Sequence, residues 1–242
     1  MRISRVFTDQ PLEPGRNITL EGRSSHYLTR VLKLRRDDPL VLFNGDGSDY
    51  AGHLVSLSRQ AAEVALNARL PAVRESPLSV TLVQAISRGE RMDISLQKST
   101  ELGVTAIQPI FTSRVEVRLE GSRLERRMTH WQGVLRSACE QCGRAVVPRL
   151  GQPVTLAEWV SEQSPVRRIM LDPGADAAIS GLVLAQPALE LLVGPEGGIS
   201  EQEAEMVRQA GVESVRLGPR VLRTETAGPA ALAALQAIMG DF

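Results

Sequence analysis

Cysteine, histidine and lysine are scarce in this chain of 242 residues. The only cysteines, Cys139 and Cys142, have no second pair with which to form a zinc site, and the three histidines share no ligand spacing. Their C-x-x-C spacing also permits a redox interpretation. However, the apolar residues between 124 and 142 recur at helical spacing, which places Cys142 on the buried face of a helix and predicts structural, reduced thiols.

The sequence also lacks a long apolar run. None approaches the roughly 20 residues that a membrane helix requires. The first five residues lead into polar Thr8, Asp9 and Gln10 instead of the apolar centre of a signal peptide. We therefore expect a cytoplasmic protein with no membrane partner, in which 43% hydrophobic residues suffice for one large or two ordinary domains.

Neither sign of charge is in excess, because 28 basic residues balance 28 acidic ones, which argues against a general nucleic-acid coat. Since Lys33 and Lys98 are the only lysines, 26 of the basic residues are arginine, which pairs bidentately with phosphate and stacks on bases. Genome composition would produce the same bias. Residues 111–150 nevertheless carry eight arginines against four glutamates, a local basic face that predicts selective docking of RNA and no DNA partner.

Short alternating segments, punctuated by proline and glycine, fill residues 1 to about 70 and are typical of a small β-barrel or meander. One helix, over residues 25–34, interrupts them. Gly45-Asp46-Gly47 is interpreted as a hairpin turn and not as part of a dinucleotide fingerprint, because Tyr50 stands where the third glycine belongs and no helix follows. Residues 71–77, rich in proline, form the best candidate linker.

After the linker, apolar strand patterns alternate with helix patterns, which predicts an α/β fold with a mostly parallel sheet covered on both faces. Thr155 with Glu158, and Ser200 with Glu203, match capping boxes at helix starts. We expect Thr226 to be the N-cap of the last helix. The expected strands are 78–86, 104–111, 166–171, 189–193 and 212–217, and the expected long helices are 90–102 and 123–143.

Two late strands run into glycine-containing loops, within residues 191–200 (LLVGPEGGIS) and 217–227 (LGPRVLRTETA). Parallel strands end at the same edge of a sheet, which is where open α/β sheets bind ligands. Glycines let the backbone approach a ligand closely, and Pro195 stiffens the first loop. The sequence has no P-loop, no G-x-G-x-x-G after its first sheet strand and no G-x-S-x-G elbow. It therefore predicts a backbone-lined pocket with Glu196, Arg220, Arg223 and Glu225 at its rim.

These two loops resemble those of the SPOUT superfamily of S-adenosylmethionine-dependent RNA methyltransferases. The closest likeness is to the ribosomal RNA small subunit methyltransferase E family, which methylates N3 of one uridine in 16S ribosomal RNA. The likeness runs nearly end to end, through segments 26–28, 84–93, 97–104, 113–114 and 140–144. It implies a PUA-like RNA-binding β-barrel over residues 1–72 and a SPOUT domain with a deep trefoil knot over 73–242. It also implies a homodimer.

The resemblance further implies a cofactor, S-adenosylmethionine, and 16S ribosomal RNA or the small ribosomal subunit as partner. Arg223 is the candidate that stabilises negative charge on the base, with Glu225 or Glu196 as proton acceptor; no metal is required. The implied cofactor-binding residues are Leu171, Val193, Gly194, Pro195, Glu196, Gly197, Gly198, Leu217, Gly218, Val221 and Leu222. The candidate RNA-binding residues are Arg2, Arg5, Arg30, Arg35, Arg114, Gln141 and Arg144.

Simpler interpretations of the same residues remain open. Glu225 with Thr224 would then only cap the last helix, Glu196 would only satisfy loop N–H groups, and the arginines would be solvated surface. At the level of function, the rivals are a non-catalytic RNA-binding protein that retains the SPOUT fold and a phosphate-binding α/β enzyme that uses the helix start near Gly197 and Gly198.

Overall fold

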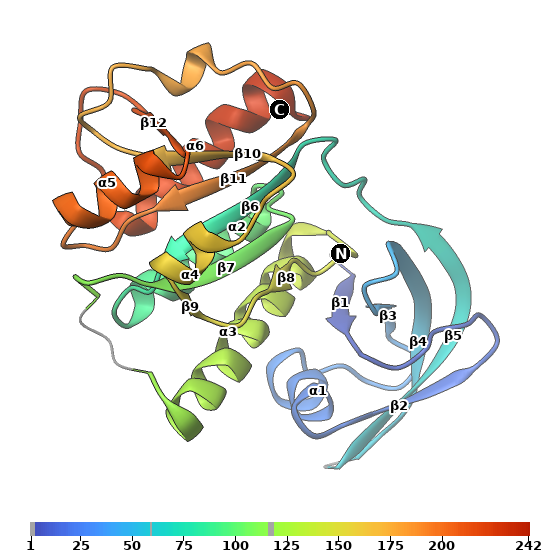
Figure 1. The fold of residues 1–242 in the computed structure, drawn as a ribbon. Helices are drawn as coiled ribbons and strands as arrows, with labels where there is room; N and C mark the ends of the chain where they lie inside the picture. The colour runs from blue at the N-terminus through green and yellow to red at the C-terminus, as the bar shows by residue number, and fades with distance from the viewer. Residues whose placement is uncertain (1–2, 59, 116–118) are drawn as a thin grey trace. The chain divides into compact units, whose positions relative to one another are not determined.

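The computed structural model describes residues 3–58, 60–115 and 119–242. The chain forms two compact units, which Figure 1 colours along the sequence. The N-terminal unit contains Met1–Glu75 and Arg136–Val147, and the C-terminal unit contains Ser76–Leu135 and Pro148–Phe242. The long helix α3 (Gly121–Cys142) contributes to both, because its last residues belong to the N-terminal unit. The domain boundary at residue 72 stays a prediction.

The N-terminal unit is built on a five-stranded sheet in the order β1-β3-β4-β5-β2. Its strands are β1 (Ser4–Phe7), β2 (Asn17–Glu21), β3 (Pro39–Phe43), β4 (Ser48–Leu57) and β5 (Ala61–Pro71). Buried and partly exposed residues alternate along β4 and β5, as expected of a sheet that covers a core on one face. Gly45 and Gly47 adopt positive φ angles in the β3–β4 connection, which confirms the predicted turn.

The helix predicted over residues 25–34 is only partly correct. The structure has a short helix α1 (Gly22–His26) followed by a π-helical turn η1 (Tyr27–Val31). The N–H of Leu32 reaches back to the Tyr27 carbonyl, and Lys33 then leaves the helical region with φ 52°. The helical segment therefore ends before Leu34, because a wide π turn and a left-handed residue terminate it.

The C-terminal unit is organised around a parallel seven-stranded sheet. The strand order is β12-β10-β11-β6-β7-β8, with β9 also pairing β7. This confirms the predicted α/β class; the trefoil knot stays a prediction. The strands are β6 (Ser79–Ala85), β7 (Ala106–Phe111), β8 (Arg149–Leu150), β9 (Val154–Thr155), β10 (Arg167–Leu171), β11 (Ala188–Val193) and β12 (Glu213–Val215).

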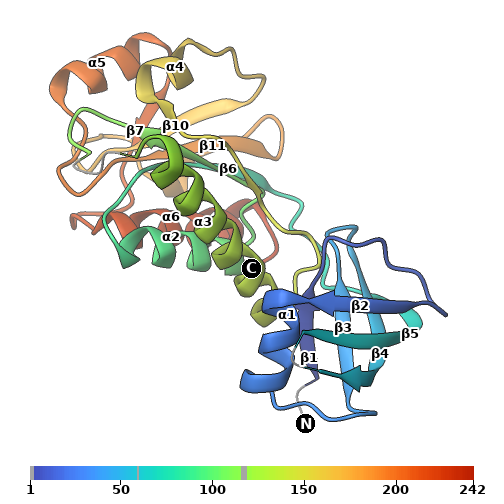
Figure 2. The same ribbon diagram turned by 90° about the horizontal axis from the view of Figure 1, so that it is seen from below.

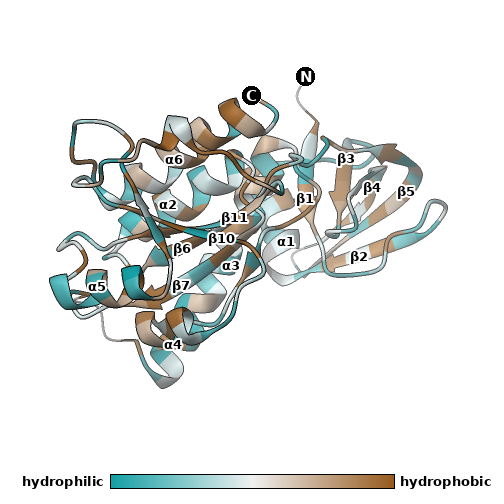
Figure 3. Ribbon diagram, turned by 45° about the horizontal axis from the view of Figure 1, so that its top comes forward, coloured by the Kyte–Doolittle hydropathy of each residue, from teal (hydrophilic) through white to brown (hydrophobic). Residues whose placement is uncertain are grey.

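Helices cover both faces of this sheet, as Figure 2 shows. On one side lie α2 (Glu90–Glu101) and α6 (Thr224–Met239), and on the other α4 (Leu156–Ser161) and α5 (Glu201–Gln209). Both predicted capping boxes are present at the starts of α4 and α5. A short 3₁₀ turn, η2 (Ile179–Gly181), precedes β11. Hydrophobic residues concentrate along the sheet strands and α6 in Figure 3, which accounts for the central position of these elements in the core.

Two local predictions are wrong. Helix α6 begins at Thr224, with Arg223 as its N-cap, and not after Thr226. The start moves because the Thr224 hydroxyl bonds to a neighbouring loop and the N–H of Thr226 already bonds to the Arg223 carbonyl. In α3, Cys139 is fully buried whereas Cys142 is only half-buried, because Cys142 is the last residue of the helix. Both thiols are free. In the described residues, no helix is long and apolar enough to span a membrane.

Candidate active site

The carboxyl ends of three adjacent strands meet at one edge of the parallel sheet. Strand β10 lies between β11 and β12, and the registers pair Met170 with Leu192 and Leu171 with Val215. The strands therefore end almost level. The loops that follow them bring together residues that are up to about fifty positions apart in the chain, as expected for a ligand-binding edge.

These loops enclose a cavity of about 600 Å³, large enough for a small-molecule ligand. Nearly every residue predicted for the cofactor lines it, and so do all three candidate catalytic residues. Gly197 alone is not part of the lining. The predicted residues that line the cavity are Leu171, Val193, Gly194, Pro195, Glu196, Gly198, Leu217, Gly218, Val221, Leu222, Arg223 and Glu225.

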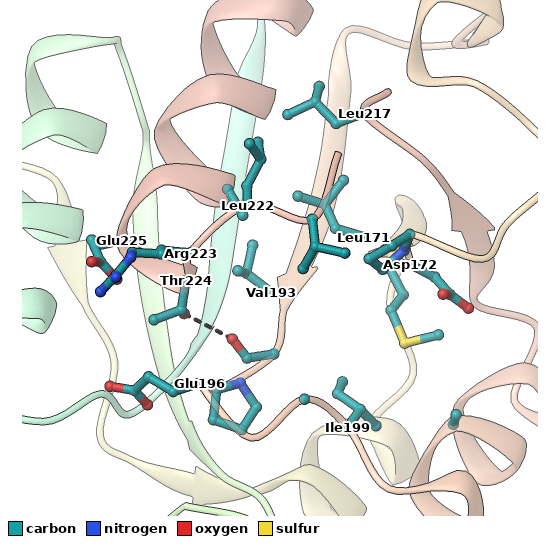
Figure 4. A pocket seen from close by; sticks show the side chains of 18 of the residues that line it. Leu171, Asp172, Val193, Glu196, Ile199, Leu217, Leu222, Arg223, Thr224 and Glu225 are labelled. Carbon is teal, nitrogen blue, oxygen red and sulfur yellow. Dashed lines mark hydrogen bonds between the residues drawn. The ribbon is translucent and has the colours of Figure 1, made fainter. Parts of the chain in front are cut away.

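The cavity has an apolar centre and charged sides. In Figure 4, Leu171, Val193 and Leu222 lie between Asp172 on one side and the charged residues Arg223, Glu225 and Glu196 on the other. The apolar side chains suit a flat or aliphatic group, while the charged rim suits polar groups at the ends of a ligand. In the described residues, no cluster of three or more His, Cys, Asp or Glu side chains is arranged to hold a metal ion.

The glycine loop after β11 has little free space. A Cβ atom on Gly194 would stand 2.9 Å from Cγ1 of Ile199, and Gly198 has a φ angle of +70°. The N–H of Gly198 donates to the Pro195 carbonyl at 2.9 Å, which closes a tight turn. Glycine is therefore required at the first position by close approach and at Gly198 by backbone conformation.

Glu196 is held by the start of α2. Its Oε1 accepts from the N–H of Arg88 at 3.2 Å and from the Arg91 guanidinium at 3.0 Å. Burial raises the pKa of Glu196, but hydrogen bonds from its own backbone N–H, from Arg91 and from Arg88 outweigh that effect and hold the pKa below its usual value. Glu196 is therefore an ionised anchor for the loop and a poor proton acceptor.

Glu225 differs from Glu196 in its partners. Its Oε2 atom is buried and has no hydrogen-bond partner among the described residues. A buried acceptor without a donor is destabilising unless a ligand or substrate supplies one. Arg223, by contrast, is exposed at the N-cap of α6, with its side chain beside Glu225 in Figure 4. Glu225 is thus the better placed of the two candidate bases.

The loop after β7 docks on the glycine loop. The backbone N–H and hydroxyl of Ser113 donate to the carboxylate of Glu203 at 2.6 and 2.7 Å, and this carboxylate also caps α5. The guanidinium of Arg114 donates to the Gly197 carbonyl at 2.9 Å. Arg114 is exposed, so it combines a structural contact to the loop with a cationic surface beside the cavity.

Two predicted RNA-binding arginines are engaged inside the N-terminal unit. Arg5 pairs with Asp49 at 2.7 Å and lies over the Phe43 ring at 4.6 Å. Arg144 is 6% exposed and forms an ion pair with Glu75. These contacts account for both arginines as internal structure, so the case for RNA contact is weaker for them than for exposed residues.

The other predicted RNA-binding residues are exposed. Arg30 and Arg35 lie on the surface of the N-terminal unit near η1, and Gln141 is exposed near the end of α3. Arg2 lies outside the described residues, as does Arg118 of the basic segment. We therefore retain Arg30, Arg35, Arg114 and Gln141 as candidates for RNA contact.

Several residues of the cavity were missed by the sequence interpretation. Asp172 directly follows predicted Leu171, and a search for polar residues at strand ends would have found it. Ile199 follows the glycine motif directly. Arg91 enters from α2, and no local pattern links it to loops more than a hundred residues away. Thr224 was predicted only as a capping residue, but it is buried and its hydroxyl donates to the Gly194 carbonyl at 2.8 Å.

Comparison with known proteins identifies the family. Residues 74–236 match the model of the RNA methyltransferase domain, and residues 20–67 match that of the RNA methyltransferase PUA domain. Ribosomal RNA small subunit methyltransferase E of Buchnera aphidicola from Schizaphis graminum is 33% identical, over 100% of this chain and 98% of the relative. The Bacillus subtilis enzyme of the same name is 27% identical over 95% of this chain and 93% of the relative.

Solved structures agree with these matches. Ribosomal RNA small subunit methyltransferase E of Neisseria gonorrhoeae, bound to S-adenosylmethionine, is 37% identical with a TM-score of 0.92 over 100% of both chains. A Legionella pneumophila protein, also solved with this cofactor, is 36% identical with a TM-score of 0.96 over 100% of both chains. The chain therefore belongs to the RNA methyltransferase family that includes ribosomal RNA small subunit methyltransferase E.

Proposed function

We propose that this protein transfers a methyl group from S-adenosylmethionine to N3 of a specific uridine in 16S ribosomal RNA. The observation that carries the proposal is the cavity at the carboxyl ends of β10, β11 and β12, in a chain whose full length aligns with two proteins solved with that cofactor. We place the reaction in the cytoplasm, because the proposed substrate is ribosomal RNA.

The cavity fits S-adenosylmethionine in size and chemistry. The apolar centre formed by Leu171, Val193 and Leu222 suits the adenine ring, and the loop backbone beside Gly194 and Gly218 is accessible to its polar edges. The charged rim suits the amino and carboxylate groups of the methionine part. When bound, the cofactor supplies a methyl group on a positively charged sulfur.

Uridine N3 carries a proton at neutral pH, so this proton must leave for the nitrogen to accept a methyl group. In our proposal Glu225 accepts it, because its buried Oε2 lacks a donor among the described residues. Arg223 stabilises the negative charge that develops on the base. Glu196 keeps the loop in place through Arg88 and Arg91. The protein then contributes mainly by holding donor and acceptor in line.

Each unit by itself offers exposed cations for contact with RNA: Arg30 and Arg35 in the N-terminal unit, and Arg114 in the C-terminal unit. The match of residues 20–67 to an RNA methyltransferase PUA domain supports such contacts. We also propose that the protein is a homodimer, because Val221, an apolar residue of the cavity wall, is 80% exposed in the single chain. Size-exclusion chromatography with light scattering tests this, and a monomer would refute it.

The decisive experiment is mass mapping of methylated uridines in 16S ribosomal RNA from cells that lack the gene, compared with cells that carry it. One uridine N3-methylation should disappear and return on complementation. Purified protein should also be stabilised against heat by S-adenosylhomocysteine. Stabilisation by nucleotides alone would favour a phosphate-binding enzyme. The absence of any ligand effect, together with unchanged methylation, would favour a non-catalytic RNA-binding protein.

A further inference from the structure

A buried glutamine lies among apolar residues of β6, paired with Val193 of β11, the strand that leads into the first glycine loop. Gln84 near the end of β6 is 0% exposed, and Leu82, Val83 and Ala85 around it are also fully buried. Burying an amide in such surroundings is costly unless each polar atom finds a partner. Gln84 is therefore expected to have a specific role, although it does not line the cavity.

The hydrogen bonds of Gln84 form a directed chain. Its Oε1 accepts from the Ser95 hydroxyl at 2.9 Å, and its Nε2 donates to Oγ1 of Thr224 at 3.0 Å and to the Ala85 carbonyl at 3.1 Å. The Thr224 hydroxyl in turn donates to the Gly194 carbonyl at 2.8 Å. Because a hydroxyl has one proton, the bond from Gln84 directs the Thr224 proton toward Gly194.

Helix α6 packs closely against this chain of hydrogen bonds. A Cβ atom on Gly228 would stand 3.4 Å from Oε1 of Gln84 and 3.4 Å from Cδ1 of Leu82, at the near limit of ordinary contact. This chain of hydrogen bonds joins four parts of the C-terminal unit: α2, β6, the start of α6 and the loop after β11. Fully satisfied buried networks of this kind rigidify what they connect.

We propose that Gln84 is a positioning residue for the cofactor loop, which acts through Thr224 on the Gly194 carbonyl without touching the cofactor. Without this chain, the Gly194 carbonyl would lose its partner and the first glycine loop would lose its attachment to α6. Because Gly194 lines the cavity proposed for the cofactor, the affinity for the cofactor should fall. The inference rests on the proposed function, since it concerns the affinity of that cavity for S-adenosylmethionine.

The test compares hydroxyl removal with hydroxyl retention at the same site. Thr224→Val keeps the shape of the side chain and should weaken binding of S-adenosylhomocysteine about tenfold by calorimetry. Thr224→Ser keeps the hydroxyl and should recover most of the affinity. Gln84→Met should weaken binding of S-adenosylhomocysteine as much as Thr224→Val does. The double variant should bind it no more weakly than either single variant, because both changes interrupt the same chain of hydrogen bonds.

The matched control is Thr100→Val in α2, which removes another fully buried hydroxyl. The Thr100 hydroxyl donates to the Leu96 carbonyl and is not part of the hydrogen-bond chain of Gln84. It should lower stability in denaturant without changing cofactor affinity. In Gln84→Met, the KM for S-adenosylmethionine should rise, while kcat at saturating cofactor should stay within about threefold of wild type.

Two results would overturn the inference while leaving the proposed function intact. One is wild-type affinity in either Gln84→Met or Thr224→Val, and the other is an equal loss of affinity in Thr100→Val. If Gln84→Met fails to fold, Ser95→Ala takes its place in the test, because it removes the hydroxyl that donates to Oε1 of Gln84. A wild-type protein that does not bind S-adenosylhomocysteine at all would instead refute the proposed function.

Discussion

A single methyl group added at Gly194 should damage the active site through steric conflict. In Gly194→Ala, the new Cβ would stand 2.9 Å from Cγ1 of Ile199, where ordinary contacts begin at 3.4 Å. Ile199 or the loop must therefore move by roughly half an ångström, and overpacking of this kind typically costs about 1–3 kcal/mol. Because both residues line the cavity, part of this cost should appear as weaker binding, and we expect the affinity for S-adenosylhomocysteine to fall by up to about 150-fold.

Calorimetric titration measures this loss, and denaturant unfolding of the unliganded protein measures the accompanying loss of stability. The control is Gly181→Ala, because a Cβ at that exposed position meets no atom within 4 Å and should change neither quantity. In a double variant, Ile199→Ala removes the opposing Cγ1 and should make the added methyl at residue 194 less harmful than in the wild-type background. Wild-type affinity in Gly194→Ala, or a penalty independent of Ile199, would refute the steric argument.

Three further outcomes are expected. Glu225→Gln should lower kcat for RNA methylation about 100-fold or more, because an amide cannot accept the uridine proton; a normal kcat would exclude Glu225 as the base. Burial raises the pKa of Glu203, but hydrogen bonds from Ser113 and Ser200 outweigh it and place the pKa below 4.5. The ionised carboxylate therefore stabilises the fold above that value, and this stabilisation is lost as the pH falls through the lower pKa of the folded state. Glu203→Gln should be less stable than wild type at neutral pH and should lose less stability than wild type on acidification to about pH 3, as measured by denaturant unfolding. Burial raises the pKa of Cys139 to about 12. At about pH 8 a thiol reagent should therefore modify only Cys142 in the native protein, and Cys139→Ser should leave the labelling unchanged. Lower labelling in Cys139→Ser would show that Cys139 also reacts.

Local patterns predicted most of the secondary structure. The capping boxes at Thr155 and Ser200 depend on residues three apart, and the parallel strands are short apolar runs. Both can therefore be predicted without knowledge of tertiary contacts. The same holds for the two glycine loops, because each follows a parallel strand and parallel strands end at the same edge of a sheet. The start of α6 was misplaced because the Thr224 hydroxyl bonds to Gly194, thirty residues away, in place of a cap.

The roles of individual polar side chains were decided only by the tertiary structure. Arg144 and Arg114 belong to the same basic segment, yet one is buried against Glu75 and the other is exposed at the Gly197 carbonyl. Likewise, Gln84 meets Thr224 across 140 positions of the chain. Composition and spacing along the chain predicted most of the helices and strands, and they predicted a ligand site at the sheet edge where the structure has a cavity. The tertiary structure alone decided which charged side chains remain available to a ligand. The order of the strands and the packing of the helices determine whether a charge is buried or paired, because the residues that bury or pair it are distant in sequence.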